Sequence, residues 1–279
     1  MKKNNAIVFG LTSNHVFAVA CMMMGLKKFS PKLADEVVVI HDGINESDQL
    51  LLNSILPVRF IEYNFPLSKL TTDSRVVKQF TKMVFSKFEC LRLLDDYRSV
   101  MWLDYDMVIQ SDISELFENS GPGIKMMPGG IPVRGQLHAD VNEFDMGVEG
   151  ICGCIFVFQD HLASYMEMYD FCCVQAEKYA DILLLGEQAI FDFMLQAFSL
   201  VPDVIDVKEY SPHPTDPVHA VNAKIIHAYG QPKFWNGLND PRWEVNYKQW
   251  VRMGGSGRQV HTLRAKAKEQ MLKISRLWS

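Results

Sequence analysis

Short apolar segments alternate with helical patterns through the first part of the chain, and this alternation limits the folds open to it. The apolar segments have the length of buried strands and cover roughly residues 5–11, 36–40, 58–63 and 99–104. The helical patterns lie between them, at about 15–28, 46–54 and 74–94. Repeated strand–helix–strand units predict a largely parallel sheet with helices on both faces, so the chain is expected to be an α/β protein.

The second half of the chain has a more mixed pattern. Further strands are predicted at 124–127, 154–158, 201–207 and 223–227, and helices at 160–179 and 186–198. Two stretches rich in glycine or proline, 121–135 and 210–218, are predicted to be loops beside the functional site. With 279 residues, 48% of them hydrophobic, the chain is long enough for one large domain. We predict this domain over 1–253, followed by a glycine-rich hinge and a tail over 254–279.

The predicted strand at 99–104 leads into two aspartates separated by one residue, Asp104 and Asp106. Because side chains alternate along an extended segment, both carboxylates are expected to point the same way. Two carboxylates this close repel each other unless a cation lies between them. In open α/β sheets, ligands bind at the carboxyl ends of strands. A polar turn, with Asp112 capping a helix that starts near Ile113, is the alternative interpretation.

Two chemistries fit such a pair of aspartates. The first is a divalent-metal clamp for a nucleotide diphosphate, in which carboxylate oxygens hold the ion and the ion neutralises phosphate charge. The second is a phosphatase reaction of the haloacid dehalogenase superfamily, whose loose apolar-D-x-D-x-V pattern is similar to the one here. That superfamily places the motif on its first strand, whereas here three predicted strands precede the motif strand.

A histidine, His227, ends the predicted strand at 223–227, and residues suited to a phosphate ligand follow it. Gly230 permits close approach of a ligand to the backbone, and Lys233 is suited to bind phosphate. With the two earlier aspartates, the histidine completes a mixed oxygen and imidazole ligand set. Such a set favours Mn²⁺, with Mg²⁺ as the alternative ion.

The D-x-D segment, followed by the H-x-x-G-x-x-K-x-W run that begins at His227, resembles glycosyltransferase family 8 from residue 5 to about 250. The resemblance implies a GT-A nucleotide-sugar fold with Asp104, Asp106 and His227 as metal ligands. It also implies a retaining, Mn²⁺-dependent transfer of a hexosyl group from a nucleotide-diphosphate sugar, with a UDP-sugar as the expected donor. The acceptor is expected to be a hydroxyl of a glycan, a glycolipid or another molecule.

The same resemblance assigns further residues to the site. The positions similar to the family's donor-binding residues are Thr12, Asn14, Lys87, Asp104, Gly230 and Lys233. Gln188, with Glu187 beside it, lies in a segment similar to the family's D-Q-D-I-L helix start, and these two residues are the expected catalytic pair. In our prediction Gln188 shields the reacting sugar carbon while the acceptor attacks from the front face.

Departures from the family pattern concentrate at one end of the expected site. Thr12-Ser13 replace acidic residues near the base and ribose, and Ile151 replaces an asparagine that resembles a donor-sugar contact. The metal and phosphate positions are kept, although residue 87 is lysine where the family has arginine. A second hypothesis therefore stays open, in which the protein binds a nucleotide sugar without transferring the sugar.

Composition and charge set further limits. A net charge of −5 and a pI near 5.9 argue against nucleic acid as a partner. The apolar segments near residue 1 are too short to span a membrane, so cytoplasmic residence is expected. The six cysteines are predicted to be reduced core thiols, and a zinc site built from Cys152, Cys154, Cys172 and Cys173 is disfavoured.

The tail has its own pattern. Residues 258–279 carry six basic side chains and one acidic side chain, with apolar residues at helical spacing. This pattern predicts an amphipathic helix, either docked on the domain or bound to the surface of an anionic membrane. Peripheral contact with the inner face of a membrane would suit a lipid-linked acceptor.

Overall fold

The computed structural model describes residues 2–64, 66–68, 70–71 and 74–258, and its centre is a seven-stranded sheet. In spatial order the strands are β3 (Val58–Glu62), β2 (Glu36–His41), β1 (Lys3–Leu11), β4 (Tyr97–Leu103), β7 (Glu149–Gln159), β6 (Ile124–Pro132) and β8 (Asp203–Val204). The first four of these run parallel, whereas β7 is antiparallel to both of its neighbours. The predicted α/β architecture with a mostly parallel sheet is confirmed.

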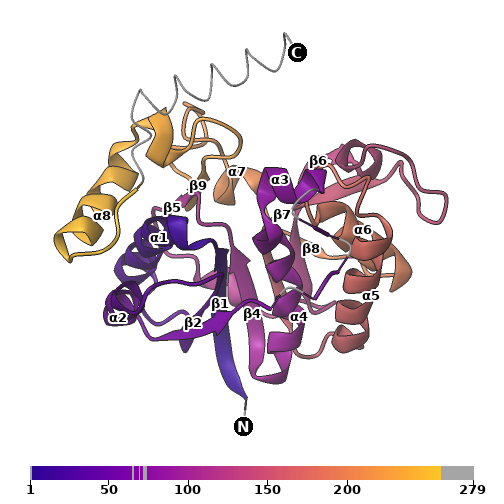
Figure 1. The fold of residues 1–279 in the computed structure, drawn as a ribbon, viewed down its shortest axis with the longest axis horizontal. Coiled ribbons are helices and arrows are strands. Elements are labelled where there is room, and N and C mark those ends of the chain that lie inside the picture. Colours follow the sequence, from indigo (N-terminus) through magenta and orange to yellow (C-terminus); the bar gives the residue numbers. More distant parts are fainter. Residues whose placement is uncertain (1, 65, 69, 72–73, 259–279) are drawn as a thin grey trace.

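Helices cover both faces of the sheet, which is why β1 is apolar over most of its length. Ala6 and Val8 pack into the hydrophobic cluster on one face, and Ile7 and Phe9 pack into the cluster on the other. On one side Figure 1 shows α1 (Val16–Phe29), α2 (Glu46–Ile55) and α8 (Pro241–Arg252). On the other side it shows α3 (Arg75–Phe80), α4 (Glu89–Arg92), α5 (Tyr165–Lys178) and α6 (Gln188–Ala197).

A second, two-stranded sheet positions the end of the aspartate motif. β5 (Met107–Ile109) directly follows Asp106 and pairs antiparallel with β9 (Ile225–His227). Met107 lies opposite His227 in this pairing, and the Ala228 amide donates to the Asp106 carbonyl at 2.9 Å. The pairing therefore brings a histidine from late in the chain beside aspartates that come far earlier.

The helix predicted at 74–94 is broken, which corrects that prediction. α3 ends before Thr81, whose φ of 65° is unfavourable for a β-branched residue, and a 3-10 helix (Lys82–Phe88) and α4 follow. The Thr81 hydroxyl accepts a hydrogen bond from the Met83 amide at 3.2 Å. The 3-10 helix packs closely on β1, because a side chain at Gly10 would collide with Ser86. Tertiary packing thus overrides the helical pattern.

Other predicted boundaries also change. The strand predicted at 124–127 is confirmed and extends to Pro132 as β6, so most of the stretch 121–135 is strand and not loop. Its backbone pairs with β7 despite its glycines and prolines. The strand predicted at 201–207 is reduced to β8, and α7 (Val207–Tyr210) follows it. A 3-10 turn (Ser114–Phe117) replaces the helix predicted near Ile113. The Asp112 carboxylate, just before this turn, accepts from the Ser30 and Ser114 hydroxyls.

Among the described residues, no helix combines the length and the apolar composition needed to cross a membrane. The tail from 259 onward lies outside the described residues, so the amphipathic helix and the boundary at 253 stay predictions. All six cysteines are free thiols in the structure. Cys172 and Cys154 lie in hydrophobic clusters on opposite faces of the sheet, whereas Cys152 and Cys173 are partly exposed.

Candidate active site

The three predicted metal ligands meet at the carboxyl end of β4. One ligand atom from each of Asp104, Asp106 and His227 lies within 4.8 Å of the other two. The imidazole Nε2 is 3.2 Å from Asp106 Oδ1, and Nδ1 is 2.9 Å from the Ser211 hydroxyl. This set of carboxylate oxygens and one imidazole suits a divalent ion such as Mn²⁺.

Charged neighbours keep the Asp106 carboxylate ionised. Burial by itself would raise its pKa, but His227 and Lys233 together hold the pKa well below its usual range. Burial would lower the pKa of His227, and the attraction of Asp106 outweighs this and raises it. Lys233 Nζ forms an ion pair with Asp106 and also donates to the Ala228 carbonyl at 2.8 Å. An ionised carboxylate is the form that a metal ligand requires.

Lys87 lies at the centre of an adjoining buried charge cluster. Its Nζ is 3.2 Å from Asp104 Oδ1 and 2.8 Å from Glu187 Oε1, and it donates to the Gly153 carbonyl at 2.8 Å. Burial would lower the pKa of Lys87, but the two carboxylates raise it, and burial raises the pKa of Glu187. A side chain at Gly153 would collide with Glu187, so glycine is required for this close approach. The cluster connects a metal ligand to the start of α6.

Gln188 is the first residue of α6 and is half-buried. Its Oε1 accepts from the Gly153 amide at 3.4 Å, and its Nε2 donates to the Leu185 carbonyl at 3.1 Å. The structure thus places Glu187 against Lys87 and Gln188 against Gly153, whose carbonyl accepts from Lys87. Their catalytic roles stay predictions.

The predicted nucleoside end lies after β1 and is more open. The Thr12 hydroxyl is 2.9 Å from His15 Nδ1, and the His15 ring stacks on Tyr105 with centroids 5.4 Å apart. Asn14 is exposed and, with Ser13, lines a pocket of about 340 Å³. The stacked rings neighbour the metal cluster, because Tyr105 is the residue between the two aspartates.

The sequence analysis missed two residues of the site, one at this end and one at the metal cluster. Asp42 follows β2, and its Oδ1 accepts from the Ser13 amide at 2.7 Å. It thereby supplies a carboxylate beside the segment where the chain lacks the family's acidic residues. The rule that singled out Asp104, a polar residue after an apolar strand, would also have found Asp42. Ser211, which contacts the His227 imidazole, has no comparable local signal.

Ile151, the departure at the sugar end, is buried in the packed start of β7. Its amide donates to the Asp192 carboxylate at 3.0 Å, and its carbonyl accepts from the Gln136 amide at 3.0 Å. Burial raises the pKa of Asp192 to about 8, although the bond from the Ile151 amide opposes the rise. The Ile151 side chain packs in the hydrophobic cluster that also contains α6 residues.

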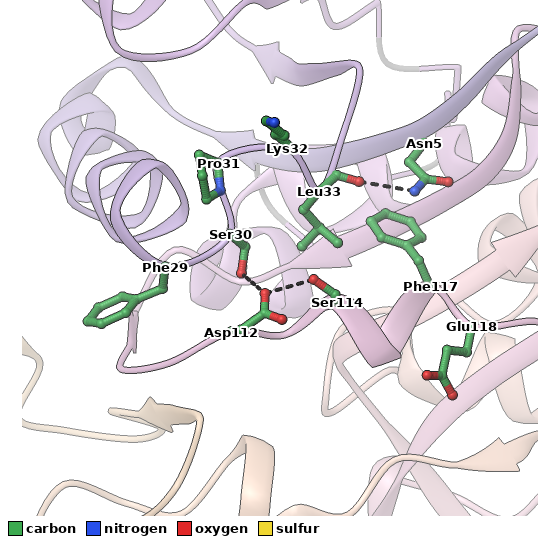
Figure 2. Close-up of a pocket in the computed structure, with 10 residues that line it drawn as sticks. All are labelled: Asn5, Phe29, Ser30, Pro31, Lys32, Leu33, Asp112, Ser114, Phe117 and Glu118. Carbon is green, nitrogen blue, oxygen red and sulfur yellow. Dashed lines mark hydrogen bonds between the residues drawn. The ribbon is translucent and has the colours of Figure 1, made fainter.

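A separate pocket of about 560 Å³ lies toward the opposite edge of the sheet (Figure 2). Asn5, one of its lining residues, pairs in register with Ser99 near the start of β4, whereas the metal cluster follows the end of that strand. Asp112 lines the same pocket, and its carboxylate accepts hydrogen bonds from two serine hydroxyls. No predicted site residue lines this pocket, so it is distinct from the candidate active site.

Comparison with protein-family models supports the expected family. Residues 6–121 match the model of glycosyl transferase family 8, and this stretch contains both aspartates of the motif and Lys87. The resemblance to glycosyltransferase family 8 is confirmed. His227, Lys233 and Gln188 lie beyond the matched stretch, and the fold brings them to it. No curated protein sequence matches the chain.

Three solved glycosyltransferase structures share the fold of this chain. The galactosyltransferase LgtC, in complex with donor and acceptor sugar analogues, gives a TM-score of 0.67 at 14% identity, over 89% of this chain and 99% of LgtC. The bifunctional glycosyltransferase WbbM gives 0.63 at 13% identity, over 89% of this chain and 52% of WbbM. The glycosyltransferase GlyE of Streptococcus pneumoniae TIGR4 gives 0.61 at 15% identity, over 92% of this chain and 65% of GlyE.

At these identities the structures establish the GT-A fold, and together with the family match they support a glycosyltransferase. Neither the family match nor the three structures supports the phosphatase alternative.

Proposed function

We propose that this protein is a metal-dependent, retaining glycosyltransferase that moves a hexosyl group from a nucleotide-diphosphate sugar, with UDP as the expected nucleotide. One observation carries the proposal: two aspartates, a histidine and two lysines converge at the carboxyl end of β4 in a family 8 fold. The arrangement offers ligands for a divalent ion and cations for a diphosphate in one place.

The proposed metal ligands are Asp104, Asp106 and His227. The donor set fits Mn²⁺ better than Mg²⁺, because Mg²⁺ prefers oxygen ligands alone and keeps several waters. A divalent ion bound there would act as a Lewis acid that neutralises the diphosphate and stabilises the departing nucleoside diphosphate. Ser211 bonds the second imidazole nitrogen and so orients the ring.

The two lysines would hold the phosphates from either side of the aspartate pair. Lys233 is bonded to Asp106 and Lys87 to Asp104, so both ammonium groups are already fixed at the site. Each would exchange part of its contact with an aspartate for a phosphate oxygen. Because these cations are present before the donor arrives, charge on the leaving group meets a preorganised environment.

Gln188 is proposed to face the reacting sugar carbon. An amide is a poor nucleophile, so we favour front-face attack by the acceptor hydroxyl, with Gln188 shielding the carbon and retention as the outcome. The Gln188 amide is held by Gly153 and Leu185, which limits its freedom to turn away. A glutamine is also the residue exchanged for glutamate in a solved active-site mutant of LgtC.

The test is a panel of nucleotide sugars incubated with the full chain and Mn²⁺, with release of nucleoside diphosphate as the measurement. We expect release for a uridine-linked hexose, and loss of release in Asp106→Ala but not in Asp112→Ala, the matched control in the separate pocket. Binding of donors without release from any of them, even with glycan acceptors added, would favour the non-transferring homologue instead.

A lipid-linked acceptor is a finer part of the proposal and rests on the basic pattern of 258–279. Deleting 259–279 should leave donor hydrolysis in solution unchanged and weaken binding to anionic vesicles, since each basic side chain near such a surface contributes about 1 kcal/mol. A truncated protein that loses hydrolysis without any lipid present would show that the tail is a structural helix.

A further inference from the structure

Two cysteines on β7, Cys152 and Cys154, lie with their sulfur atoms 3.0 Å apart beside the candidate active site. On a regular strand, residues two positions apart are separated by about 6.6 Å. Here the pairing with β6 is irregular: Met126 pairs with Phe156, and the next residue, Met127, pairs with Cys152. This bulge lies where the two thiols come together and explains their contact.

We propose that Cys152 and Cys154 form a redox-sensitive dithiol that a hydroperoxide converts reversibly to an intrachain disulfide. A disulfide requires a sulfur separation of about 2.05 Å, so the sulfurs need to approach by only about 1 Å. Cys152 is partly exposed, whereas Cys154 is buried, so an oxidant reaches Cys152 first. This site does not depend on the proposed glycosyltransferase function.

The chemistry balances with one molecule of hydrogen peroxide. The Cys152 thiolate attacks a peroxide oxygen, the O–O bond breaks, and a sulfenic acid and a hydroxide ion result. The hydroxide takes up the proton that the Cys152 thiol had released and becomes the first water. The Cys154 thiol then attacks the Cys152 sulfur, the S–O bond breaks, and the S–S bond and a second water form. The two thiols already share a hydrogen bond, and the thiolate is the form that attacks the peroxide.

The residue between the two cysteines connects this pair to the site. The Gly153 carbonyl accepts from Lys87, and the Gly153 amide donates to Gln188. Closing a ring across Gly153 reorients both of its peptide groups. Oxidation is therefore expected to disturb Lys87 and Gln188 together and to weaken nucleoside diphosphate binding.

The experiment treats the full chain with equimolar hydrogen peroxide, alkylates free thiols and cleaves after glutamate. Cleavage after Glu149 and Glu167 isolates a peptide, 150–167, whose only cysteines are Cys152 and Cys154. We expect this peptide to escape alkylation and to be lighter by two hydrogens than the reduced peptide. Dithiothreitol should restore it.

Matched variants distinguish disulfide formation between Cys152 and Cys154 from oxidation of other cysteines. Cys173→Ser, on α5, should form the disulfide normally, whereas Cys154→Ser should stop at a sulfenic acid on Cys152 that dimedone traps. A native peptide that stays fully alkylated after peroxide treatment would overturn the proposal.

Calorimetry of UDP and Mn²⁺ binding to oxidised and reduced protein tests the consequence for the site. We expect at least a severalfold loss of affinity that dithiothreitol reverses. Disulfide formation with unchanged UDP affinity would overturn the coupling to the site. A protein that transfers no sugar at all would leave the disulfide result standing, so failure of the proposed function is distinguishable.

Discussion

At the proposed metal and phosphate end of the site, the side chains of Lys87, His227 and Asp106 are 8%, 7% and 13% exposed, and each has an ionic partner. At the proposed nucleoside end, Ser13 and Asn14 are exposed, and the Asp42 carboxylate that reaches Ser13 is exposed as well. By the resemblance, the expected family pattern is kept at the first end apart from lysine at residue 87, and the chain departs from it at the second.

The free-energy cost of a substitution is expected to be higher at the buried end than at the open end. Removing one member of a buried ion pair leaves an uncompensated charge, which costs several kcal/mol, whereas an exposed polar side chain can be exchanged for little. Lys87 and Asp106 are therefore constrained by stability as well as by the proposed ligand binding. At the open end only the ligand constrains the residues, so specificity can change there without loss of the fold.

The largest effect is expected from Asp106→Ala, which removes a metal ligand from the buried end. Changing outer contacts of a metal ligand typically costs 10- to 100-fold, so loss of the ligand itself should lower Mn²⁺ affinity at least ~100-fold. Calorimetry with Mn²⁺ and UDP measures this loss, and thermal unfolding checks that the fold is retained. Wild-type affinity in this variant would remove Asp106 from the metal site.

Lys233→Ala tests whether the buried end binds phosphate. A hydrogen bond to a charged group contributes about 1.5–3 kcal/mol, so UDP affinity should fall roughly 10- to 150-fold. Affinity for uridine, which has no phosphate, should stay unchanged. Lys208→Ala, at an exposed lysine on α7, is the control. Equal losses for UDP and uridine would place Lys233 outside the phosphate site.

Acidification should weaken metal binding through His227. Its pKa is raised in the metal-free protein, chiefly by Asp106 acting against burial, and only the neutral imidazole binds a metal. Below that pKa a proton competes with the ion, so apparent Mn²⁺ affinity should fall by up to ~10-fold per pH unit, and above it the affinity should level off. His227→Gln should remove this contribution, while His213→Gln should retain it. An unchanged pH profile in His227→Gln would contradict the assignment.

The smallest effect is expected at the open end, from Asp42→Asn. Asparagine still accepts from the Ser13 amide but carries no charge. Weakening a hydrogen bond to the nucleoside by about 0.5–1.5 kcal/mol should weaken uridine binding about 3- to 10-fold and leave pyrophosphate binding unchanged. Asp140→Asn, at another exposed aspartate, controls for the change in net charge. A loss of pyrophosphate affinity in Asp42→Asn would show that the two ends are not independent.

The aspartate motif, the histidine run and the strand–helix alternation could all be recognised from the sequence, because each depends on local periodicity or on residues a few positions apart. The break of the helix at Thr81 could not be predicted from the sequence, because it accompanies the close packing of Ser86 on Gly10, which is far away in the sequence. For the same reason the continuation of the predicted 124–127 strand to Pro132 was taken for a loop, because that part of the strand depends on pairing with β7.

The sequence by itself determined the residue types of the candidate site and the strand ends that carry them, because an apolar strand followed by polar residues is visible in a short segment of sequence. Only the tertiary structure decided which charges meet. The bonds from Lys87 to Glu187, from Asp42 to Ser13 and from Ser211 to His227 each join segments that no local pattern relates. These contacts depend on strand order and register, which arise when the hydrophobic clusters on both faces of the sheet pack together.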